Sequence, residues 1–346
     1  MAKQYKLAII GFGNVGQGLA QIICDKYEFL KDRFGTDIRI VAVCDLLKGS
    51  VANPEGLNPQ TLLDCLARDG DFRSVDASSS GWNAQQTIRN SGADVLVELA
   101  YTDLSTGEPS LSHVKQALKQ GMHVSMTNKG PVALHFPALR KMAARNGVQI
   151  GIEGTVMSGT PALNLGSEML LAAGITRIQG ILNGTTNYIL GEMEAGAQYA
   201  VALSKAQELG YAEADPTGDV DGHDAAAKVV ILGNLLMDLS ITLSDVNCTG
   251  ISHLTPADID KAKSEDCCWK LIGTVEKSAN SFIASVKLKK IKNGHPLSAI
   301  SGATNAITYS TKLLGDVTLV GPGAGRMETG YAVIQDILAF HKNVNN

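Results

Sequence analysis

An apolar strand that runs directly into three spaced glycines opens the chain and constrains its fold. Residues 7–10 form the strand, the turn is Gly11-Phe12-Gly13-Asn14-Val15-Gly16, and residues 17–24 have helical apolar spacing. Such glycines permit a tight turn, let a pyrophosphate approach the backbone, and allow a helix to pack closely on the strand. The helix N-terminus then presents backbone amides to the anion. The motif therefore predicts a dinucleotide site at Gly11, Phe12, Gly13, Asn14, Val15 and Gly16.

The second predicted strand, residues 38–44, ends at Asp45. An acidic residue at this point usually accepts hydrogen bonds from the adenosine ribose. The separation between Gly16 and Asp45 is longer than the usual ~20 residues, so residues 25–37 must form a longer connection. The carboxylate would repel a 2'-phosphate, which favours NAD as the cofactor. NADP stays open, because Lys48 could pair with that phosphate.

Strands alternate with helices over the first part of the chain. Residues 94–99 and 123–126 read as strands, and residues 112–119 form a crossover helix between them. This order predicts an α/β fold with a doubly wound parallel sheet of the Rossmann type. Ligands of such sheets gather at the carboxyl ends of the strands, which places Thr102 and Lys129 at the nicotinamide end.

Five carboxylates lie within residues 213–224, and an apolar helical run with a single lysine, Lys228, follows them. A helix that is apolar nearly all round is normally buried, and lysine is almost never buried unless it is paired. Asp224 is the natural partner, because residues four apart share a helix face. The pattern indicates a site that binds an ammonium group and moves a proton. Two ordinary alternatives stay open, a solvated surface pair and a lysine that extends its ammonium to water.

Small polar residues follow a further predicted strand at residues 178–182. The turn Asn183-Gly184-Thr185-Thr186-Asn187 suits a strand-to-helix connection with Thr185 or Thr186 as N-cap, and also a loop that faces a substrate. Residues 273–291 alternate like antiparallel strands, and residues 329–340 form an apolar helix. We therefore divide the chain into a dinucleotide-binding domain (1–149), a second domain (150–318) and a C-terminal segment (319–346) whose helix returns to the first domain.

Composition argues against several classes of protein. The net charge of −4 gives no electrostatic reason to expect nucleic acid as a partner, and no apolar segment approaches the ~18 residues of a membrane span. The six cysteines show no CxxC pair and no metal-ligand spacing with histidine. Scattered thiols of this kind are typical of a cytoplasmic protein without a disulfide framework.

Several motifs together give the chain a resemblance to the homoserine dehydrogenase family along essentially its whole length. They are the glycine turn at residues 11–16, Thr127-Asn128-Lys129, GILNGTTNYIL at residues 180–190, and A-x3-GYAE-x-DP-x2-DV-x-G-x-D-x3-K at residues 206–228. The last pattern is long and specific. A terminal G-x-GAG-x3-T at residues 321–329 agrees with it.

The resemblance implies an enzyme that reversibly reduces L-aspartate 4-semialdehyde to L-homoserine with NAD(P)H, in the biosynthesis of threonine, methionine and isoleucine. It also implies a homodimer built through an α+β second domain with a mixed sheet. Many relatives carry a C-terminal regulatory domain, and because this sequence stops at Asn346 it resembles the short form without one.

The resemblance further implies roles for particular residues. Lys129 and Lys228 would be the candidates for proton transfer, and which of them delivers the proton stays open. The residues that would bind substrate or orient the lysines are Glu213, Asp219, Asp224, Asn183, Gly184 and Thr185. The cofactor site would combine the glycine turn and Asp45 with Thr102, Lys129 and Gly325. A monovalent cation, Na⁺ or K⁺, would be bound by Glu153, Val156, Ser158 and Thr160, although Met157-Ser158-Gly159-Thr160 departs from the family's usual small-residue sequence.

Two other functions stay open at this point. The acidic stretch would suit a dehydrogenase of another amino-acid alcohol or aldehyde, and a non-catalytic NAD-binding sensor could share the fold. A sensor needs no proton-transfer lysine, so the combination of Lys129, Asp224 and Lys228 favours an enzyme.

Overall fold

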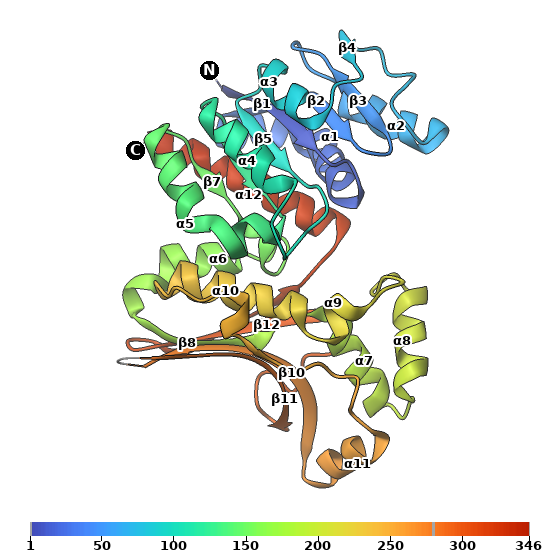
Figure 1. Ribbon diagram of the computed structural model, residues 1–346, viewed down its shortest axis with the longest axis vertical. Coiled ribbons are helices and arrows are strands. Elements are labelled where there is room, and N and C mark those ends of the chain that lie inside the picture. Colours follow the sequence, from blue (N-terminus) through green and yellow to red (C-terminus); the bar gives the residue numbers. More distant parts are fainter. Residues whose placement is uncertain (1, 279–280, 346) are drawn as a thin grey trace. The chain divides into compact units, whose positions relative to one another are not determined.

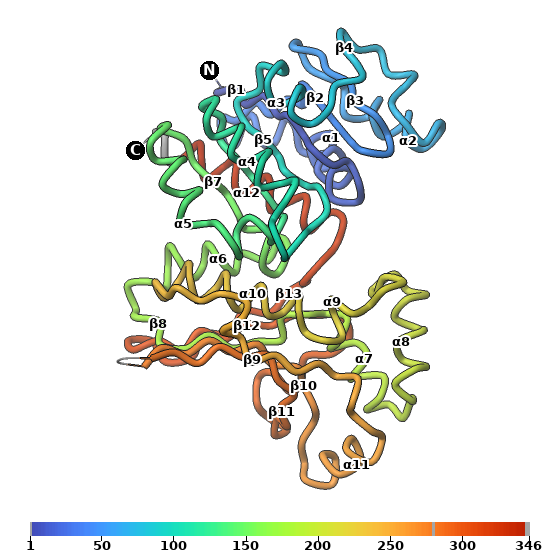
Figure 2. The backbone as a smooth tube through the Cα atoms, viewed as in Figure 1, coloured from blue at the N-terminus to red at the C-terminus, as the bar shows by residue number. Residues whose placement is uncertain are grey.

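The computed structural model describes residues 2–278 and 281–345, which divide into two compact units (Figure 1). The first unit holds the described residues up to Gly159 and from Gly325 onward, and the second unit is Thr160–Ala324. The second unit is thus inserted between two parts of the first, which the colours of the tube in Figure 2 let the reader follow. The boundaries expected from the sequence, at 149/150 and 318/319, fall ten and six residues before the observed ones at 159/160 and 324/325.

Among the described residues, the first unit contains a seven-stranded sheet in the order β4-β3-β2-β1-β5-β6-β7. Its strands are β1 (Lys3–Ile10), β2 (Thr36–Asp45), β3 (Gly49–Ala52), β4 (Ser79–Ser80), β5 (Val95–Glu98), β6 (His123–Met126) and β7 (Ile150–Gly151). The run from β2 through β1, β5 and β6 to β7 is parallel, whereas β3 and β4 extend the β2 edge in antiparallel fashion. The predicted doubly wound α/β sheet is confirmed, and the two antiparallel edge strands are an addition to it.

The helices of the first unit are α1 (Asn14–Phe34), α2 (Pro59–Asp69), α3 (Ala84–Asn90), α4 (Ser110–Lys119), α5 (Lys129–Arg145) and α12 (Arg326–Asn345), with a 3₁₀ turn at Glu153–Thr155. Helix α1 is longer than the predicted residues 17–24. It continues to Gly35, which has a left-handed backbone (φ 65°) and closes the helix with hydrogen bonds to the carbonyls of Leu30 and Lys31. Because no glycine or proline interrupts residues 25–34, nothing ends the helix earlier. These extra turns account for the long separation between Gly16 and Asp45.

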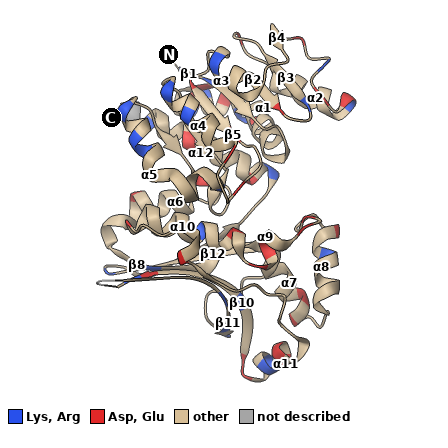
Figure 3. Cartoon of the chain, viewed as in Figure 1, with Lys and Arg blue, Asp and Glu red and all other residues tan. Residues whose placement is uncertain are grey.

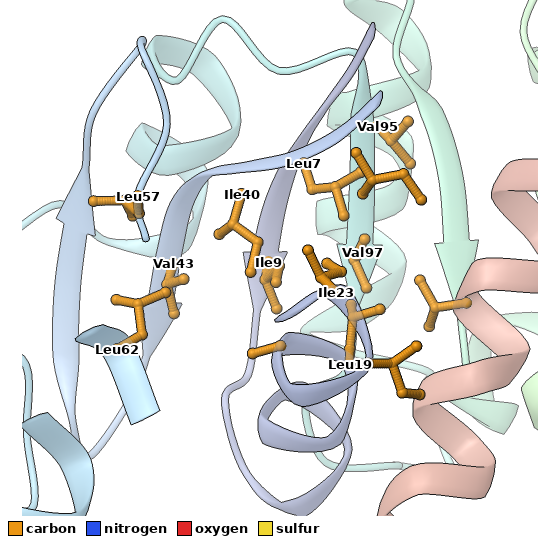
Figure 4. Packing of buried hydrophobic residues seen from close by; sticks show 14 of the residues in the cluster. Leu7, Ile9, Leu19, Ile23, Ile40, Val43, Leu57, Leu62, Val95 and Val97 are labelled. Carbon is orange, nitrogen blue, oxygen red and sulfur yellow. The ribbon is translucent and has the colours of Figure 1, made fainter. Parts of the chain in front are cut away.

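The core of the first unit lies between its central strands and helix α1 (Figure 4). Leu7 and Ile9 of β1 are fully buried, as are Ile40 of β2 and Leu19 of α1. Each such side chain contributes about 1.5–3 kcal/mol of burial free energy. The C-terminal helix supplies four more members of this core, which are Val333, Ile334, Ile337 and Phe340.

Helices α1 and α12 approach each other closely. A Cβ at Gly18 of α1 would lie 2.0 Å from the carbonyl oxygen of Arg326, at the start of α12. A Cβ at Gly330 of α12 would in turn lie 2.6 Å from the Leu19 backbone nitrogen. Glycine is therefore required on both helices, because any side chain would force the two backbones apart.

In the described part of the chain, the second unit contains a six-stranded sheet in the order β13-β12-β8-β10-β11-β9. Its strands are β8 (Ile175–Ile181), β9 (Asn247–Cys248), β10 (Cys267–Lys277), β11 (Phe282–Lys292), β12 (Thr304–Thr311) and β13 (Gly315–Pro322). All neighbours are antiparallel except β9 and β11, which run parallel. The mixed sheet is thus confirmed, and so are the antiparallel strands predicted for residues 273–291.

The helices of the second unit are α6 (Ala162–Asn164), α7 (Gly184–Glu194), α8 (Tyr199–Glu208), α9 (Thr217–Val220), α10 (His223–Leu236) and α11 (Pro256–Ser264), with a π-helical segment at Leu165–Leu170 and 3₁₀ turns at Leu171–Ala173 and Leu243–Asp245. Helix α10 packs on one face of the sheet (Figure 1). A Cβ at Gly233 of α10 would lie 3.0 Å from Val275 of β10, and one at Gly273 of β10 would lie 3.0 Å from Val229. This contact carries the only lysine of α10, Lys228, into the interior of the unit.

Residues 2–278 and 281–345 include no helix that combines the length and the apolar character needed to cross a membrane.

Candidate functional site

The glycine turn between β1 and α1 has the shape that a dinucleotide requires. Gly11 has a positive φ of 88°, and a Cβ there would lie 2.6 Å from the Leu99 carbonyl oxygen. At Gly13, by contrast, a Cβ would meet nothing within 4 Å. Gly13 is also the N-cap of α1, and no side chain caps this helix. The first amides of α1 are therefore left to bind an anion, and the turn fits a pyrophosphate.

Asp45 ends β2 beside this turn. Its carboxylate accepts hydrogen bonds from the backbone N–H of Phe12 (2.8 Å), Leu47 (3.0 Å) and Lys48 (3.1 Å). The Lys48 ammonium lies 3.4 Å from the same carboxylate. Burial by itself would raise the pKa of Asp45, but these hydrogen bonds and the Lys48 charge outweigh it and lower the pKa. Asp45 is therefore a fixed negative charge next to the glycine turn, and Lys48 is already paired with it.

At the carboxyl ends of β5 and β6, a single asparagine joins two loops. Asn128 is the N-cap of α5, and its side-chain oxygen accepts a hydrogen bond from the Gly130 N–H. Its side-chain nitrogen donates to the carbonyl oxygens of Ala100 and Tyr101. Lys129 is the first residue of α5 and is half-buried, whereas Thr102 is exposed in the loop after β5. Asn128 therefore ties the loop before Thr102 to the helix start that carries Lys129.

In the second unit, the turn after β8 is capped by Asn183 and not by either threonine. Asn183 is the N-cap of α7, and its side-chain oxygen accepts a hydrogen bond from the Thr186 N–H (2.9 Å). The prediction of Thr185 or Thr186 as N-cap was wrong. The helix begins at Gly184, where a Cβ would lie 2.4 Å from the Ala303 carbonyl oxygen. The Thr185 hydroxyl donates instead to the Tyr211 carbonyl oxygen (2.6 Å).

Lys228 lies in the interior of the second unit with two oxygen partners. The side chain is 6% exposed, and its ammonium donates to Asp224 Oδ2 (2.6 Å) and to the Leu182 carbonyl oxygen (2.7 Å). The predicted pairing of Lys228 with Asp224 is thereby confirmed, and the surface alternatives are wrong. Two of the three N–H groups of this buried ammonium are thus bonded within the protein.

The amide of Asn183 connects this ion pair to a second carboxylate. Its side-chain nitrogen donates to Asp219 Oδ1 (2.6 Å) and to Asp224 Oδ2 (3.1 Å). Burial raises the pKa of Asp219, and the neighbouring Asp224 charge raises it further, although Asn183 and Lys228 act against both. The structure thus brings together Asn183, Asp219, Asp224 and Lys228.

Glu213 does not join this group through any contact found among the described residues. Its side chain is exposed, and only its backbone carbonyl accepts a hydrogen bond, from Gln207. It lies in the acidic segment that leads to α9, where Figure 3 shows several red residues close together. The segment concentrates negative charge around the start of α10, which suits a cationic group.

The residues predicted to bind a cation fall on both sides of the boundary between the units. Glu153, Val156 and Ser158 are buried in the first unit, and Thr160 is buried in the second, where its hydroxyl donates to the Pro322 carbonyl oxygen. Met157 and Ser158 both have left-handed backbones (φ 59° and 49°), a costly conformation for residues with side chains. Glu153 is thus a buried carboxylate four residues before this turn. No group of three or more His, Cys, Asp or Glu side chains in the described residues could hold a metal ion.

Gly325, predicted for the cofactor site, is the first residue of the chain's return to the first unit. Its φ is 144°, and a Cβ would lie 2.1 Å from Glu328 Oε2. The φ value, which L side chains rarely adopt, therefore favours glycine where the chain enters α12.

Several buried charged side chains were not predicted from the sequence, and Lys270 and Asp336 are two of them. Lys270 of β10 is 2% exposed, and its ammonium donates to the Ile300 carbonyl oxygen (2.7 Å) and to Asn187 Oδ1 (3.2 Å). Asp336 of α12 is 4% exposed and accepts a hydrogen bond from Ser125 Oγ (2.6 Å). In the sequence, each of these two residues is marked only by its charge at a position of a strand or helix that faces the interior.

Comparison with known proteins agrees with this geometry. The family model described as homoserine dehydrogenase, NAD binding domain, matches residues 11–153, and the model described as homoserine dehydrogenase matches residues 161–338. The NAD(+)-dependent homoserine dehydrogenase of Pseudomonas canavaninivorans is 45% identical over 341 residues, which is 98% of this chain and 97% of that protein.

Solved structures give the same result. A crystal structure of a putative homoserine dehydrogenase from Archaeoglobus fulgidus superposes with a TM-score of 0.88 at 34% identity, covering 97% of this chain and 99% of that one. A mutant homoserine dehydrogenase of a hyperthermophilic archaeon, in complex with NADPH, gives a TM-score of 0.85 at 28% identity and covers 99% and 98% of the two chains.

The Rossmann-type first unit, with its open glycine turn, and the matched NAD-binding family define an NAD(P)-dependent oxidoreductase. Both units match, and the matches together span almost the whole sequence. The chain belongs to the homoserine dehydrogenase family.

Proposed function

We propose that the protein catalyses the reversible reduction of L-aspartate 4-semialdehyde to L-homoserine, with Lys129 and Lys228 as the groups that handle the proton. One observation carries this proposal. Lys228 is buried with its ammonium bonded to Asp224 and to the Leu182 carbonyl, while Asn183 links Asp224 to Asp219. This arrangement offers a held proton donor next to carboxylates that suit an amino-acid ammonium.

The chemistry follows from the donor count of a lysine. An ammonium has three N–H groups, and two of those of Lys228 are bonded within the unit. The third can donate to the aldehyde oxygen while reduced nicotinamide, when bound, supplies a hydride to the aldehyde carbon. In the reverse direction the neutral amine accepts the alcohol proton. Lys129, at the start of α5 in the first unit, is the other candidate for the same step.

The substrate's remaining groups are assigned to the side chains around Lys228. Asp219 and Asp224 would bind the α-ammonium, together with Glu213, which needs to approach the ligand from its exposed position. Asn183, Gly184 and Thr185 lie at the N-terminus of α7, where backbone amides favour an anion such as the α-carboxylate. An ammonium between the carboxylates would also offset the burial that raises the pKa of Asp219.

We infer a preference for NADH over NADPH. Asp45 is held as a negative charge beside the glycine turn, and Lys48, the residue that could attract a 2'-phosphate, is already paired with it. The most similar relative described above is named as NAD(+)-dependent. Against this preference, the archaeal relative with a solved structure in complex with NADPH is a mutant homoserine dehydrogenase that holds the phosphorylated cofactor.

We further propose a monovalent cation, Na⁺ or K⁺, at Glu153, Val156, Ser158 and Thr160. The buried Glu153 carboxylate and the tight turn at residues 157–158 support it. Activity titrated with KCl and NaCl against tetramethylammonium chloride, at constant ionic strength, tests this assignment. Equal activity in all three salts would contradict it.

Two broader inferences concern assembly and location. We infer a homodimer through the sheet face that faces away from α10, where Arg177 donates to Ser310 and Lys289 to Thr274. Light scattering after gel filtration should give twice the chain mass of 36.4 kDa.

The scattered cysteines favour the cytoplasm as the location of the protein. Fractionation of expressing cells would test this inference.

The decisive experiment is NADH and NADPH oxidation with L-aspartate 4-semialdehyde, run side by side. We expect turnover with both cofactors and a higher kcat/KM with NADH. A panel of other amino-acid aldehydes and alcohols tests for a different substrate. Tight NADH binding without any turnover would instead indicate a sensor.

A further inference from the structure

We propose that Ser110 is a positioning residue that links the buried Glu98–His113 pair to the start of α5 and so fixes the backbone at Lys129. The inference rests on the proposed role of Lys129 in proton transfer. It concerns four side chains of the first unit. None of the four was among the predicted site residues, although their neighbour Lys129 was.

The anchor of the arrangement is the carboxylate of Glu98, at the end of β5. Glu98 is 0% exposed, and a buried carboxylate is costly unless hydrogen bonds satisfy it. Three donors do so, namely the Ala100 N–H (3.0 Å), Ser110 Oγ (2.9 Å) and His113 Nδ1 (2.8 Å). Ser110 and His113 both come from α4, so one carboxylate holds the first turn of α4 against the end of β5.

The other end of the arrangement is Asn128, the residue directly before Lys129. Its side-chain nitrogen donates to Ser110 Oγ (2.8 Å) as well as to the carbonyls of Ala100 and Tyr101. Its side-chain oxygen accepts the Gly130 N–H (3.0 Å). Asn128 is 2% exposed, so these bonds do not compete with water.

The residue directly after Lys129 is also held. A Cβ at Gly130 would lie 2.3 Å from the Asp103 carbonyl oxygen and 3.1 Å from the Gly107 α-carbon. Lys129 therefore stands between two residues whose backbone positions are fixed by buried contacts. The same contacts fix the loop of residues 100–103, which contains Thr102.

Ser110 joins the two ends. Its hydroxyl donates to Glu98 and accepts from Asn128, and it is 0% exposed. A hydroxyl can do both at once, whereas alanine would remove one of the three donors to Glu98 and the contact of Asn128 with α4. A displacement of about 1 Å at a reacting group can cost about 100-fold in rate. Removal of the hydroxyl should therefore change the placement of Lys129 without removing its amine.

The experiment compares Ser110→Ala with Ser112→Ala, two residues further along the same helix. Ser112 is half-buried; its backbone N–H donates to Glu108, and its hydroxyl has no hydrogen-bond partner among the described residues. For both variants, kcat and KM for L-aspartate 4-semialdehyde and the NADH dissociation constant are measured. Each substitution is then repeated in a Lys129→Ala background, which completes a double-mutant cycle.

We expect Ser110→Ala to lower kcat about tenfold or more and to leave the NADH dissociation constant close to that of the wild type. The kcat of Ser112→Ala should also be close to that of the wild type. In the Lys129→Ala background the same substitution should have no further effect on the residual rate, because there is no amine left to misplace. An equal loss in both backgrounds would overturn the proposal, since it would show that the hydroxyl acts independently of Lys129. Unchanged kcat in Ser110→Ala would overturn it as well.

Should Ser110→Ala fail to fold, Ser110→Cys keeps nearly the same volume and offers only weak hydrogen bonds. It is judged by the same cycle, with the same two contradicting results. Full activity of Lys129→Ala alone would contradict the proposed proton-transfer role of Lys129. A loss in Lys129→Ala with no loss in Ser110→Ala would contradict only the positioning inference.

Discussion

Lys228 Nζ lies 2.6 Å from Asp224 Oδ2, one helical turn earlier on α10, in a segment that is otherwise apolar. The same ammonium reaches across to the Leu182 carbonyl, at the end of β8. The pair thus joins a helix to the loop that begins α7. Its position makes it both a structural contact and the proposed proton donor, and substitutions can separate these two roles.

Lys228→Met should lower kcat for aldehyde reduction about 100-fold or more, because a proton donor contributes about 10² to 10⁴ in rate. Methionine preserves most of the buried stem, so the NADH dissociation constant should stay within about twofold. Steady-state kinetics and a cofactor titration measure the two quantities. Lys205→Ala, an exposed lysine on α8, is the matched control. A Lys228→Met enzyme with normal kcat would remove Lys228 from the mechanism.

Asp219→Asn should weaken substrate binding and stabilise the fold at neutral pH. The raised pKa of Asp219 means that the folded chain holds this proton more tightly than the unfolded chain. Its contribution to stability is therefore present at low pH and is lost as the pH rises, whereas asparagine stays neutral throughout. We expect a higher Tm than wild type at pH 8 and equal values only well below pH 3.8. KM for homoserine should rise about tenfold, which corresponds to ~1.4 kcal/mol. A KM equal to wild type would show that Asp219 does not contact the substrate.

Oxidation of homoserine should have a more alkaline optimum than reduction of the aldehyde. A lysine ammonium can donate directly, but it must lose its proton before it can accept one, and ordinary lysines do so near pH ~10.4. Initial rates are measured in both directions from about pH 6 to about pH 10, because over this range the lysine side chain changes from almost wholly protonated to partly neutral. An oxidation rate that is already constant at neutral pH would argue against a lysine base.

Asp45→Asn should improve the use of NADPH relative to NADH. The substitution keeps an acceptor for the Phe12 N–H but removes the charge that would repel a 2'-phosphate, and it frees Lys48 to pair with that phosphate. We expect the ratio of kcat/KM values to shift towards NADPH about tenfold, or ~1.4 kcal/mol. Asp64→Asn, an exposed aspartate on α2, serves as the control. The same ratio in both variants would mean that Asp45 does not read the ribose.

Asp336→Asn should alter how stability depends on pH. Burial raises the pKa of Asp336 to about 8 from the ordinary 3.8, the Glu153 charge adds to this effect, and the Ser125 hydrogen bond opposes it. The stability that this raised pKa represents is fully present below pH 3.8 and is lost as the pH rises to about 8, at up to ~1.4 kcal/mol per pH unit. Asparagine resembles the neutral carboxyl, so the variant should melt progressively higher than wild type between pH 5 and pH 8. Parallel melting curves over that range would contradict the assignment.

The contacts that could be predicted are those within one element or one turn. The pairing of Asp224 with Lys228 follows from helix periodicity alone, and the glycine turn follows from its place between a strand and a helix. The position of the α7 cap was missed because the choice between Asn183 and Thr185 depends on where β8 ends. That end is set by pairing with β12, more than a hundred residues later.

The contacts that could not be predicted join distant parts of the chain. Asp336 meets Ser125 across 211 residues, and Lys270 meets Asn187 across 83. Nothing local in the sequence distinguishes these charged side chains from solvated ones. Helix α1 was predicted too short for a simpler reason, since the charged residues after Cys24 face outward and hide the apolar spacing.

The close crossing of α1 and α12 has a consequence for how the polypeptide is made. Four core side chains of the first unit, at positions 333–340, are the last of that core to leave the ribosome. The inserted unit, complete at Ala324, emerges before them. During translation the first unit therefore lacks four of its core side chains until the whole inserted unit has been synthesised.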